Sequence, residues 1–273
     1  MHVRLEAEAP EEPAAAAAEE APGALGIHHE GFASPEIHYD ELESADPGQI
    51  LAWATATIPE LAIATSFQSA GMVLLHLLRG MRPDLPVLFL DTGFHFQETL
   101  DFAAEVTERW DLRLVSLRGE HGSAEGQAAI HGPELYKRDP DQCCFINKVE
   151  PLQRALENYD GWISGIRRDQ SPLRARTPIV EAQMLPSGNE ILKIHPLANW
   201  SKNDVAAYVA EHEIPTHPLL EKGFASIGCW PCTRAVRPGE DERSGRWDGL
   251  DKSECGIHAF GKAHGPKETE AEQ

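Results

Sequence analysis

Five cysteines are the residues of this chain whose types and spacing are best suited to chemistry. Cys143 and Cys144 are adjacent, and Cys229 and Cys232 form a C-W-P-C unit about 85 residues later. Cys255 stands alone in E-C-G-I-H, near the C-terminus. Two pairs of thiols indicate one metal centre, and a fifth thiol in a separate segment indicates a reactive nucleophile.

The spacing of the two pairs bears on the kind of metal. Zinc ligands that come in pairs are usually separated by two to four residues, so the adjacent Cys143 and Cys144 suit zinc poorly. An iron–sulfur cube offers several irons, so neighbouring thiolates can each bind one while C-x-x-C binds two more. Lys148, one helical turn after Cys144, would offset the negative charge of four thiolates. The residues favour a cluster and leave zinc open, and their odd number disfavours complete disulfide pairing.

Composition limits the class of protein. The hydrophobic content of 41% is enough for the core of one large domain, and the formal net charge of −20 disfavours nucleic-acid binding. No segment has the basic start and apolar run of a signal peptide, and no apolar run is long enough to cross a bilayer. We therefore expect a cytoplasmic protein, bound neither to membranes nor to nucleic acid, whose thiols stay reduced.

Charge is distributed unevenly along the chain. Residues 1–46 hold twelve Asp or Glu against one basic residue, Arg4, together with an alanine run and several prolines. This composition is typical of a disordered segment. We expect a disordered acidic tail over residues 1–45, an α/β domain with the metal site over 46–248, and a mobile C-terminal tail with Cys255 over 249–273.

Strand and helix patterns alternate along the middle of the chain. Strands are predicted over residues 61–67, 86–90, 112–117, 162–166 and 190–196. Helices are predicted over residues 49–58, 72–78, 96–110, 142–156 and, with Ser201 and Asp204 forming a capping box, 201–211. Alternation requires crossover connections, so we expect a mostly parallel sheet with helices on both faces. Such sheets bind ligands at the carboxyl ends of their strands.

Polar motifs follow three of the predicted strands. S-F-Q-S-A-G over residues 66–71 has small residues that let backbone N–H groups surround an anion, although it lacks the P-loop lysine. D-T-G over residues 91–93 is compatible with a functional loop or a plain turn, and an aspartic protease would need a second such motif. After the strand over 162–166, Arg167, Arg168, Arg174 and Arg176 lie within ten residues, which favours an anion site.

Several motifs, taken in order, resemble the assimilatory adenylylsulfate (APS) reductases of the PAPS/APS reductase family. They are C-C-F-I-N-K-V-E-P-L, S-I-G-C-W-P-C-T, G-R-W, K-S-E-C-G-I-H, L-D-T-G-F-H-F-Q-E-T and S-G-I-R-R-D-Q-S-P, within about residues 63–258. The related phosphoadenylylsulfate (PAPS) reductases share the tail but usually lack the cysteine pairs. Asn147 departs from the pattern, because many members have arginine there.

The resemblance implies a fold, an activity and roles for individual residues. The fold would be of the adenine nucleotide alpha hydrolase-like type, and the reaction would reduce APS to sulfite and AMP with thioredoxin or a similar dithiol, in assimilatory sulfate reduction. Cys255 would attack the sulfur of APS and carry an S-sulfocysteine intermediate. Cys143, Cys144, Cys229 and Cys232 would hold a [4Fe-4S] cluster, polarised by Lys148. The implied substrate-binding residues are Ser66, Gln68, Ser69, Gly71, Leu90, Asp91, Thr92, Gly93, Arg167, Arg168, Arg243, Arg246 and His258.

Other functions remain open at this point. A PAPS reductase is one alternative, and an ATP-dependent thiolase of the same fold is another. The thiolases use S-G-G-x-D-S where this chain has S-A-G-M-V. A non-enzymatic metal-binding module would leave E-C-G-I-H without a role. The sequence does not fix the native reductant or the oligomeric state, for which a homo-oligomer is one option.

Overall fold

A computed structural model describes residues 39–250 and 252–258. The strands are β1 (Leu61–Ala64), β2 (Val87–Leu90), β3 (Leu114–Leu117), β4 (Gly161–Ser164), β5 (Val180–Met184) and β6 (Glu190–Ile194). The α-helices are α1 (Tyr39–Leu42), α2 (Pro47–Thr57), α3 (Ser69–Arg79), α4 (Gln97–Trp110), α5 (Ala124–His131), α6 (Leu135–Arg138), α7 (Pro140–Cys144), α8 (Glu150–Leu156) and α9 (Lys202–Glu211). Single turns are π-helical over Phe145–Val149 and 3-10 over Arg168–Gln170, Pro172–Arg174, Pro218–Leu220, Trp230–Cys232 and Gly256–His258.

The strands form one sheet in the order β3-β2-β1-β4-β6-β5. All neighbours are parallel except β5 and β6, and Ile63 of β1 pairs with Val87 of β2 and Ile163 of β4. The order reverses between β1 and β4, because the chain builds β1, β2 and β3 outward and then returns to the other side of β1. The predicted α/β fold with a mostly parallel sheet is confirmed, and ligands bind such sheets at this reversal point.

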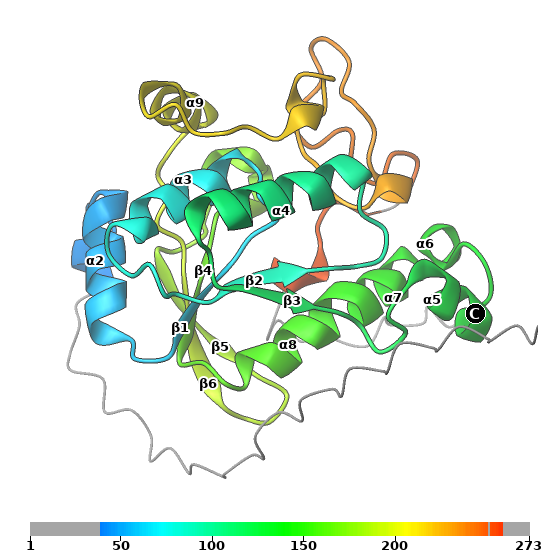
Figure 1. The fold of residues 1–273 in the computed structure, drawn as a ribbon, viewed down its shortest axis with the longest axis horizontal. Helices are drawn as coiled ribbons and strands as arrows, with labels where there is room; N and C mark the ends of the chain where they lie inside the picture. The colour runs from blue at the N-terminus through cyan, green and yellow to red at the C-terminus, as the bar shows by residue number, and fades with distance from the viewer. Residues whose placement is uncertain (1–38, 251, 259–273) are drawn as a thin grey trace, which may run out of the picture. The chain divides into compact units, whose positions relative to one another are not determined.

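Helices cover both faces of the sheet (Figure 1). On β1, Ile63 packs into a core with side chains of α2, α3, α4 and α9, whereas Ala62 packs with Leu152 and Leu156 of α8 on the opposite face. Successive side chains of a strand point to opposite faces, so a fully buried central strand needs helices on both. The prediction of two covered faces is confirmed.

Local capping signals set the ends of two helices. Asp46 accepts a hydrogen bond from the Gln49 backbone N–H at 2.9 Å and Gln49 returns one, while Pro47 occupies the first turn of α2. At the start of α9, Ser201 and Asp204 form the predicted capping box. These pairs satisfy backbone groups that a helix start otherwise leaves open.

The helix predicted over residues 142–156 is interrupted by a π-turn. Glu150 donates its backbone N–H to the Phe145 carbonyl, five residues back. Pro151 has no N–H to donate to the Asn147 carbonyl, and a widened turn accommodates that loss. The π-turn carries Asn147 and Lys148, and α7 just before it carries Cys143 and Cys144.

Strand β5 was not predicted from the sequence. It lies at the sheet edge, and Gln183, 4% exposed, is its one buried residue. The Gln183 side-chain oxygen accepts a hydrogen bond from the Trp162 indole at 3.0 Å. A strand of this polarity gives no hydrophobic alternation to detect.

Both predicted tails lie partly outside the described residues. Residues 1–38 and 259–273 are not described. The described residues begin at Tyr39, and the Glu43 carboxylate accepts hydrogen bonds from Arg168 at 2.6 Å and from the Ile179 backbone at 2.9 Å. Residues 252–258 of the predicted C-terminal tail are packed against the domain, where Ile257 contacts the core beneath α8.

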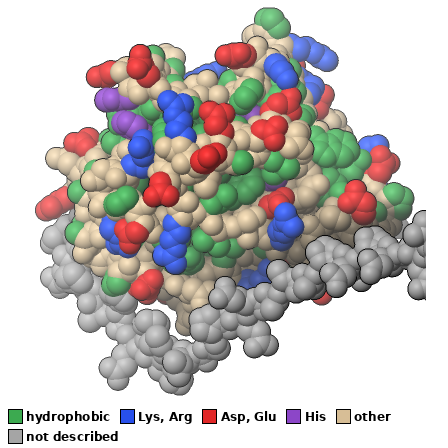
Figure 2. Space-filling view, viewed as in Figure 1, with side chains coloured by type: hydrophobic (Ala, Val, Ile, Leu, Met, Phe, Trp, Pro, Cys, Tyr) green, Lys and Arg blue, Asp and Glu red, His purple; other side chains and the backbone are tan. Residues whose placement is uncertain are grey.

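The surface carries both signs of charge. On the face in Figure 2, lysine and arginine side chains are interspersed with aspartate and glutamate. In the part of the chain that the structure describes, none of the helices has the length and apolarity needed to span a bilayer.

Candidate active site

A cavity of about 680 Å³ opens at the carboxyl ends of β1, β2 and β4. This size falls within the range of small-molecule sites. Its walls include ten predicted substrate-binding residues: Ser66, Gln68, Ser69, Gly71, Leu90, Thr92, Arg167, Arg243, Arg246 and His258. The same walls include Cys255 and Lys148. Segments far apart in the sequence therefore meet at the place where the topology predicts a ligand.

The loop between β1 and α3 is tied down from several sides. The Gln68 amide donates to the Ile227 carbonyl at 2.9 Å and accepts from the Ile227 N–H at 2.8 Å. A side chain at Gly71 would place its Cβ 2.1 Å from the Thr65 hydroxyl oxygen, so the loop requires glycine there. Phe67 is fully buried with φ of +56°, a left-handed conformation that is costly for a residue other than glycine. The loop is held in one shape beside the cavity.

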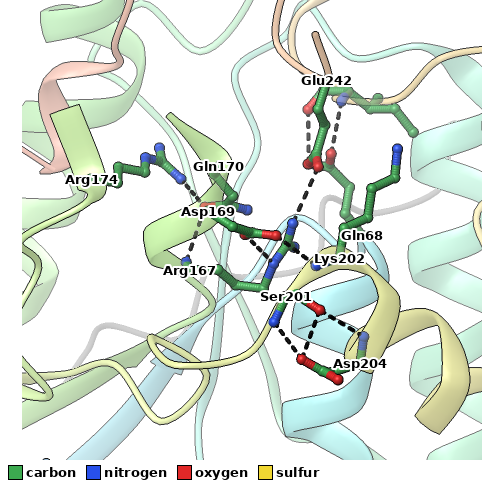
Figure 3. A network of polar contacts seen from close by, with 10 residues as sticks. Gln68, Arg167, Asp169, Gln170, Arg174, Ser201, Lys202, Asp204 and Glu242 are labelled. Carbon is green, nitrogen blue, oxygen red and sulfur yellow. Dashed lines mark hydrogen bonds and ion pairs between the residues drawn. The ribbon is translucent and has the colours of Figure 1, made fainter. Parts of the chain in front are cut away.

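Arg167 lies in the cavity wall as part of a buried ion-pair network. Its guanidinium donates to Asp169 at 2.9 Å and to Glu242 at 3.2 Å, and its side chain is 5% exposed. Figure 3 shows Arg167 between these two carboxylates, with Asp169 also reaching the backbone of Lys202. The network joins the loop after β4 to α9 and to the segment that precedes Arg243.

Three predicted substrate residues do not line the cavity. Arg168 donates to the Thr177 carbonyl at 2.8 Å and to Glu43 at 2.6 Å. Its guanidinium is therefore hydrogen-bonded to groups outside the cavity. Asp91 accepts from Arg118 at 2.6 Å and from the Gly93 N–H at 3.2 Å. The structure therefore does not bring Arg168, Asp91 or Gly93 together with the others, and their role stays a prediction.

Arg243 and Arg246 present unused hydrogen-bond donors. The Nε atom of each is buried and has no hydrogen-bond partner among the described residues. Both guanidinium groups lie against Trp247, 5.7 and 4.4 Å from its ring centroid. Both arginines also line the cavity, and two guanidinium groups in one cavity wall suit an anionic ligand.

The four paired cysteines line one smaller pocket beside the cavity. Its walls also contain Lys148, Asn147, Arg246 and Trp247. The Trp247 N–H donates to the Cys232 carbonyl at 3.0 Å, and Thr233 forms a β-bridge with Arg246, which places the arginine segment against C-x-x-C. Lys148 and Arg246 line both spaces, and the Thr92 hydroxyl lies 3.4 Å from the Cys229 sulfur. The pocket and the cavity therefore share a wall.

The four cysteines of this pocket are a set of sulfur donors for a metal centre. In residues 39–250 and 252–258, no three His, Cys, Asp or Glu side chains are grouped so that they could hold one metal ion. Zinc binds such donors directly, with sulfurs about 2.3 Å from the metal, whereas a [4Fe-4S] cube binds each thiolate through a different iron. Four thiols around one pocket are the donor type that either centre uses.

Two neutral amides, from Asn147 and Gln127, lie beside Cys143. Asn147, 5% exposed, hydrogen-bonds the side-chain oxygen of Gln127 and donates to the Cys143 carbonyl at 2.9 Å. Both amides also lie within hydrogen-bonding distance of the Cys143 sulfur, each at 3.7 Å. Gln127 lies 20 residues before Asn147, and the sequence offered no signal for it.

Lys148 supplies positive charge at the shared wall. Burial alone would lower the pKa of Lys148, but the neighbouring Cys229, Cys255 and Cys144, as thiolates, outweigh burial and raise the pKa. The lysine is therefore charged at neutral pH. In contrast, burial raises the pKa of Cys232 to about 11, and Cys229 contributes in the same direction.

Cys255 lies between the cavity and the cysteine pocket. It is 8% exposed. In the metal-free protein, interaction with the protonated Cys144 thiol lowers the pKa of Cys255, burial opposes this shift, and the charge of Lys148 adds to it. Burial, Arg174 and Lys193 together lower the pKa of the nearby His258, which keeps its ring neutral. The predicted nucleophile is thus placed among cations in the cavity wall.

Comparison with known proteins identifies the family. Residues 60–235 match the family model of the phosphoadenosine phosphosulfate reductase domain, and the chain belongs to this family. The prediction of an oxidoreductase that acts on a sulfur group is confirmed. The protein named adenosine 5'-phosphosulfate reductase in Streptomyces coelicolor is 44% identical over 80% of this chain and 90% of its own. The protein of that name in Deinococcus radiodurans is 43% identical over 78% and 81%.

Solved structures agree with this membership. The phosphoadenylyl-sulfate reductase of Candida auris, in a phosphate complex, is 31% identical with a TM-score of 0.64, over 75% of this chain and 99% of its own. An FMN adenylyltransferase of Candida glabrata in complex with ATP is 16% identical with a TM-score of 0.50, over 79% and 74%, which shows the fold alone. The prediction of an adenine nucleotide alpha hydrolase-like fold is confirmed.

Proposed function

We propose that this protein reduces adenylyl sulfate (APS) to sulfite and AMP, in assimilatory sulfate reduction, with electrons from thioredoxin or a similar dithiol protein. The observation that carries the proposal is the position of Cys255, in the wall of a nucleotide-sized cavity beside Arg243 and Arg246. The relatives named adenosine 5'-phosphosulfate reductase support the choice of substrate. Five free cysteines and thiol chemistry suit the reducing cytoplasm.

In this proposal the nucleoside and the anionic end of the substrate contact different walls of the cavity. The nucleoside lies along the β1–α3 loop and the end of β2, where Ser66, Ser69 and Leu90 line the cavity. The phosphate and sulfate lie against Arg243 and Arg246, whose guanidinium groups line the cavity and can pair with anionic oxygens. This placement brings the sulfate sulfur toward Cys255.

The first chemical step transfers the sulfo group to the enzyme. The Cys255 thiolate attacks the sulfate sulfur, an S–S bond forms, and the bond between sulfur and the bridging phosphate oxygen breaks. AMP leaves with that electron pair, and the positive charges around its phosphate favour the departure. Cys255 is left as S-sulfocysteine.

The second step discharges that intermediate. One thiolate of the dithiol attacks the Cys255 sulfur and displaces sulfite, and its second thiol then resolves the mixed disulfide. Cys255 returns as thiolate and the reductant becomes a disulfide, which accounts for the two electrons. Because Cys255 is 8% exposed, residues 252–258 must leave the cavity before a protein reductant can reach it.

We propose that Cys143, Cys144, Cys229 and Cys232 hold a [4Fe-4S] cluster. When bound, it would polarise the sulfate end of the site, and the thiols of the reductant supply the electrons. Lys148 and Arg246 line both spaces, so their charged groups are able to link the cysteine pocket to the substrate anion.

Gly228→Ala is expected to weaken substrate binding by displacing Arg246. A Cβ at residue 228 would lie 2.3 to 2.9 Å from the atoms of that guanidinium, which must move away. The KM for APS and the dissociation constant for AMP should rise about tenfold, or about 1.4 kcal/mol. Gly80→Ala is the matched control, because its Cβ would meet only the Leu77 carbonyl oxygen, at 3.7 Å. Unchanged AMP binding in Gly228→Ala would remove Arg246 from the proposed anion site.

The enzyme is expected to prefer APS to PAPS by at least about tenfold in kcat/KM, or about 1.4 kcal/mol. The 3′-phosphate of PAPS needs a cation near the ribose, and residues 66–71 contain neither lysine nor arginine. Sulfite release is measured anaerobically with each nucleotide and thioredoxin. Equal efficiency, or a preference for PAPS, contradicts this expectation and would direct attention to Lys202, which also lines the cavity.

A further inference from the structure

Glu254, the residue before the proposed nucleophile, is held by two arginines from other segments. Arg174 donates to both of its carboxylate oxygens, at 2.8 and 2.7 Å. Arg243 donates to one of these oxygens at 2.8 Å, and the Cys255 backbone N–H donates to the same oxygen at 3.0 Å. The carboxylate therefore connects the backbone of Cys255 directly to two fixed guanidinium groups.

These contacts are strong because they are shielded from water. The side chains of Arg174, Arg243 and Glu254 are 9%, 14% and 19% exposed. Two-pronged arginine–carboxylate pairs fix geometry as well as charge, and partial burial strengthens them relative to surface ion pairs. Arg174 is itself fixed by Gln170 in the turn after β4, as Figure 3 shows.

The carboxylate also separates two like charges. Arg174 and Arg243 both approach the same oxygen of Glu254, so without it their guanidinium groups would face each other uncompensated. Arg243 also lines the cavity, so one guanidinium group borders both the tail and the proposed anion site.

We propose that Glu254 is a positioning residue, whose carboxylate docks residues 252–258 on Arg174 and Arg243 and so seats the Cys255 thiol in the cavity. This role deepens the proposed function, on which it rests. Breaking the two-arginine contact is then the event that frees Cys255 for the reductant. Within the arginine cluster after β4, Arg174 therefore holds the tail, whereas other arginines are assigned to the substrate.

The first test measures access to Cys255 without substrate. Holoprotein is treated with iodoacetamide, and labelling of the peptide that contains Cys255 is followed by mass spectrometry. Glu254→Gln and Arg174→Gln should each label at least about tenfold faster than wild type, and the double variant should label no faster than either. Glu254→Asp, which keeps the charge, should recover part of the protection. Arg174→Gln removes the other partner of the same ion pair. The proposal can therefore still be tested if one of the two variants does not fold.

Glu240→Gln is the matched control. Glu240 accepts a two-pronged pair from Arg234, at 2.7 and 3.2 Å, and does not line the cavity. It should label at the wild-type rate. Labelling of Glu254→Gln at the wild-type rate, or equally fast labelling of Glu240→Gln, overturns the proposal.

A second measurement separates formation of the S-sulfo adduct, which needs Cys255 in the cavity, from removal of the adduct by the reductant. In a single turnover with saturating APS, Glu254→Gln should form the S-sulfo adduct at least about tenfold more slowly. Thioredoxin should then discharge a preformed adduct at least as fast as in wild type, a split that a general loss of structure would not give. A slower discharge with normal adduct formation contradicts the proposal. Absence of any adduct in wild type would contradict the proposed function instead, and the labelling comparison would still stand.

Discussion

Cys255→Ser is expected to lower sulfite release from APS by more than about a thousandfold. A serine hydroxyl is a far weaker nucleophile than a thiolate, and no other described cysteine lines the large cavity. Initial rates are measured anaerobically with thioredoxin and saturating APS. The effect should appear in kcat, because the arginines that bind the substrate are unchanged.

Two controls separate loss of the nucleophile from loss of the site. Cys255→Ser should bind AMP with the wild-type dissociation constant and should retain its iron and sulfide. Turnover within tenfold of wild type in this variant would show that a different residue accepts the sulfo group, and the mechanism would fail.

Cys144→Ser and Cys232→Ser are each expected to lose the metal centre together with activity. Anaerobically purified wild-type protein should be yellow-brown and contain about four iron and four sulfide per chain. Each substitution removes one of four thiolates around the pocket, and a hydroxyl does not replace a thiolate for iron. Iron and acid-labile sulfide are measured beside sulfite release.

Cys255→Ser serves as the matched cysteine control for these variants, since its iron content should not change. Stoichiometric zinc with no inorganic sulfide in the anaerobic wild-type protein would overturn the assignment of the cluster. That result would show that the four cysteines bind zinc, the alternative that their spacing in the sequence left open.

Local signals in the sequence were enough to predict most of the sheet. The central strands are continuous apolar runs such as L-A-I-A, which a sheet buried on both faces requires. The Ser201 and Asp204 capping box marked the start of α9 in the same way. Strand β5 escaped because an edge strand with one buried residue, Gln183, has no such pattern. The π-turn escaped because periodicity does not report which carbonyl each N–H reaches.

Residue type also could not decide which arginines face the cavity. Arg167, Arg168 and Arg174 look equivalent in sequence, yet Arg168 is drawn away by Glu43, which lies 125 residues earlier. Arg174 lines the cavity, but its guanidinium is paired with Glu254, 80 residues later. Partners so distant along the chain are set by the fold. The cysteines stand out without such partners, because their pairing and the isolated Cys255 are visible in the sequence itself.

The most direct test of the account is the mass of the protein after it meets APS with no reductant present. Anaerobic wild-type enzyme should release about one AMP per chain and gain the mass of one SO3 group, on the peptide that contains Cys255. Added thioredoxin should then remove that mass and release an equal amount of sulfite. No mass gain, or a gain on any other residue, would contradict the proposal that Cys255 carries the reaction.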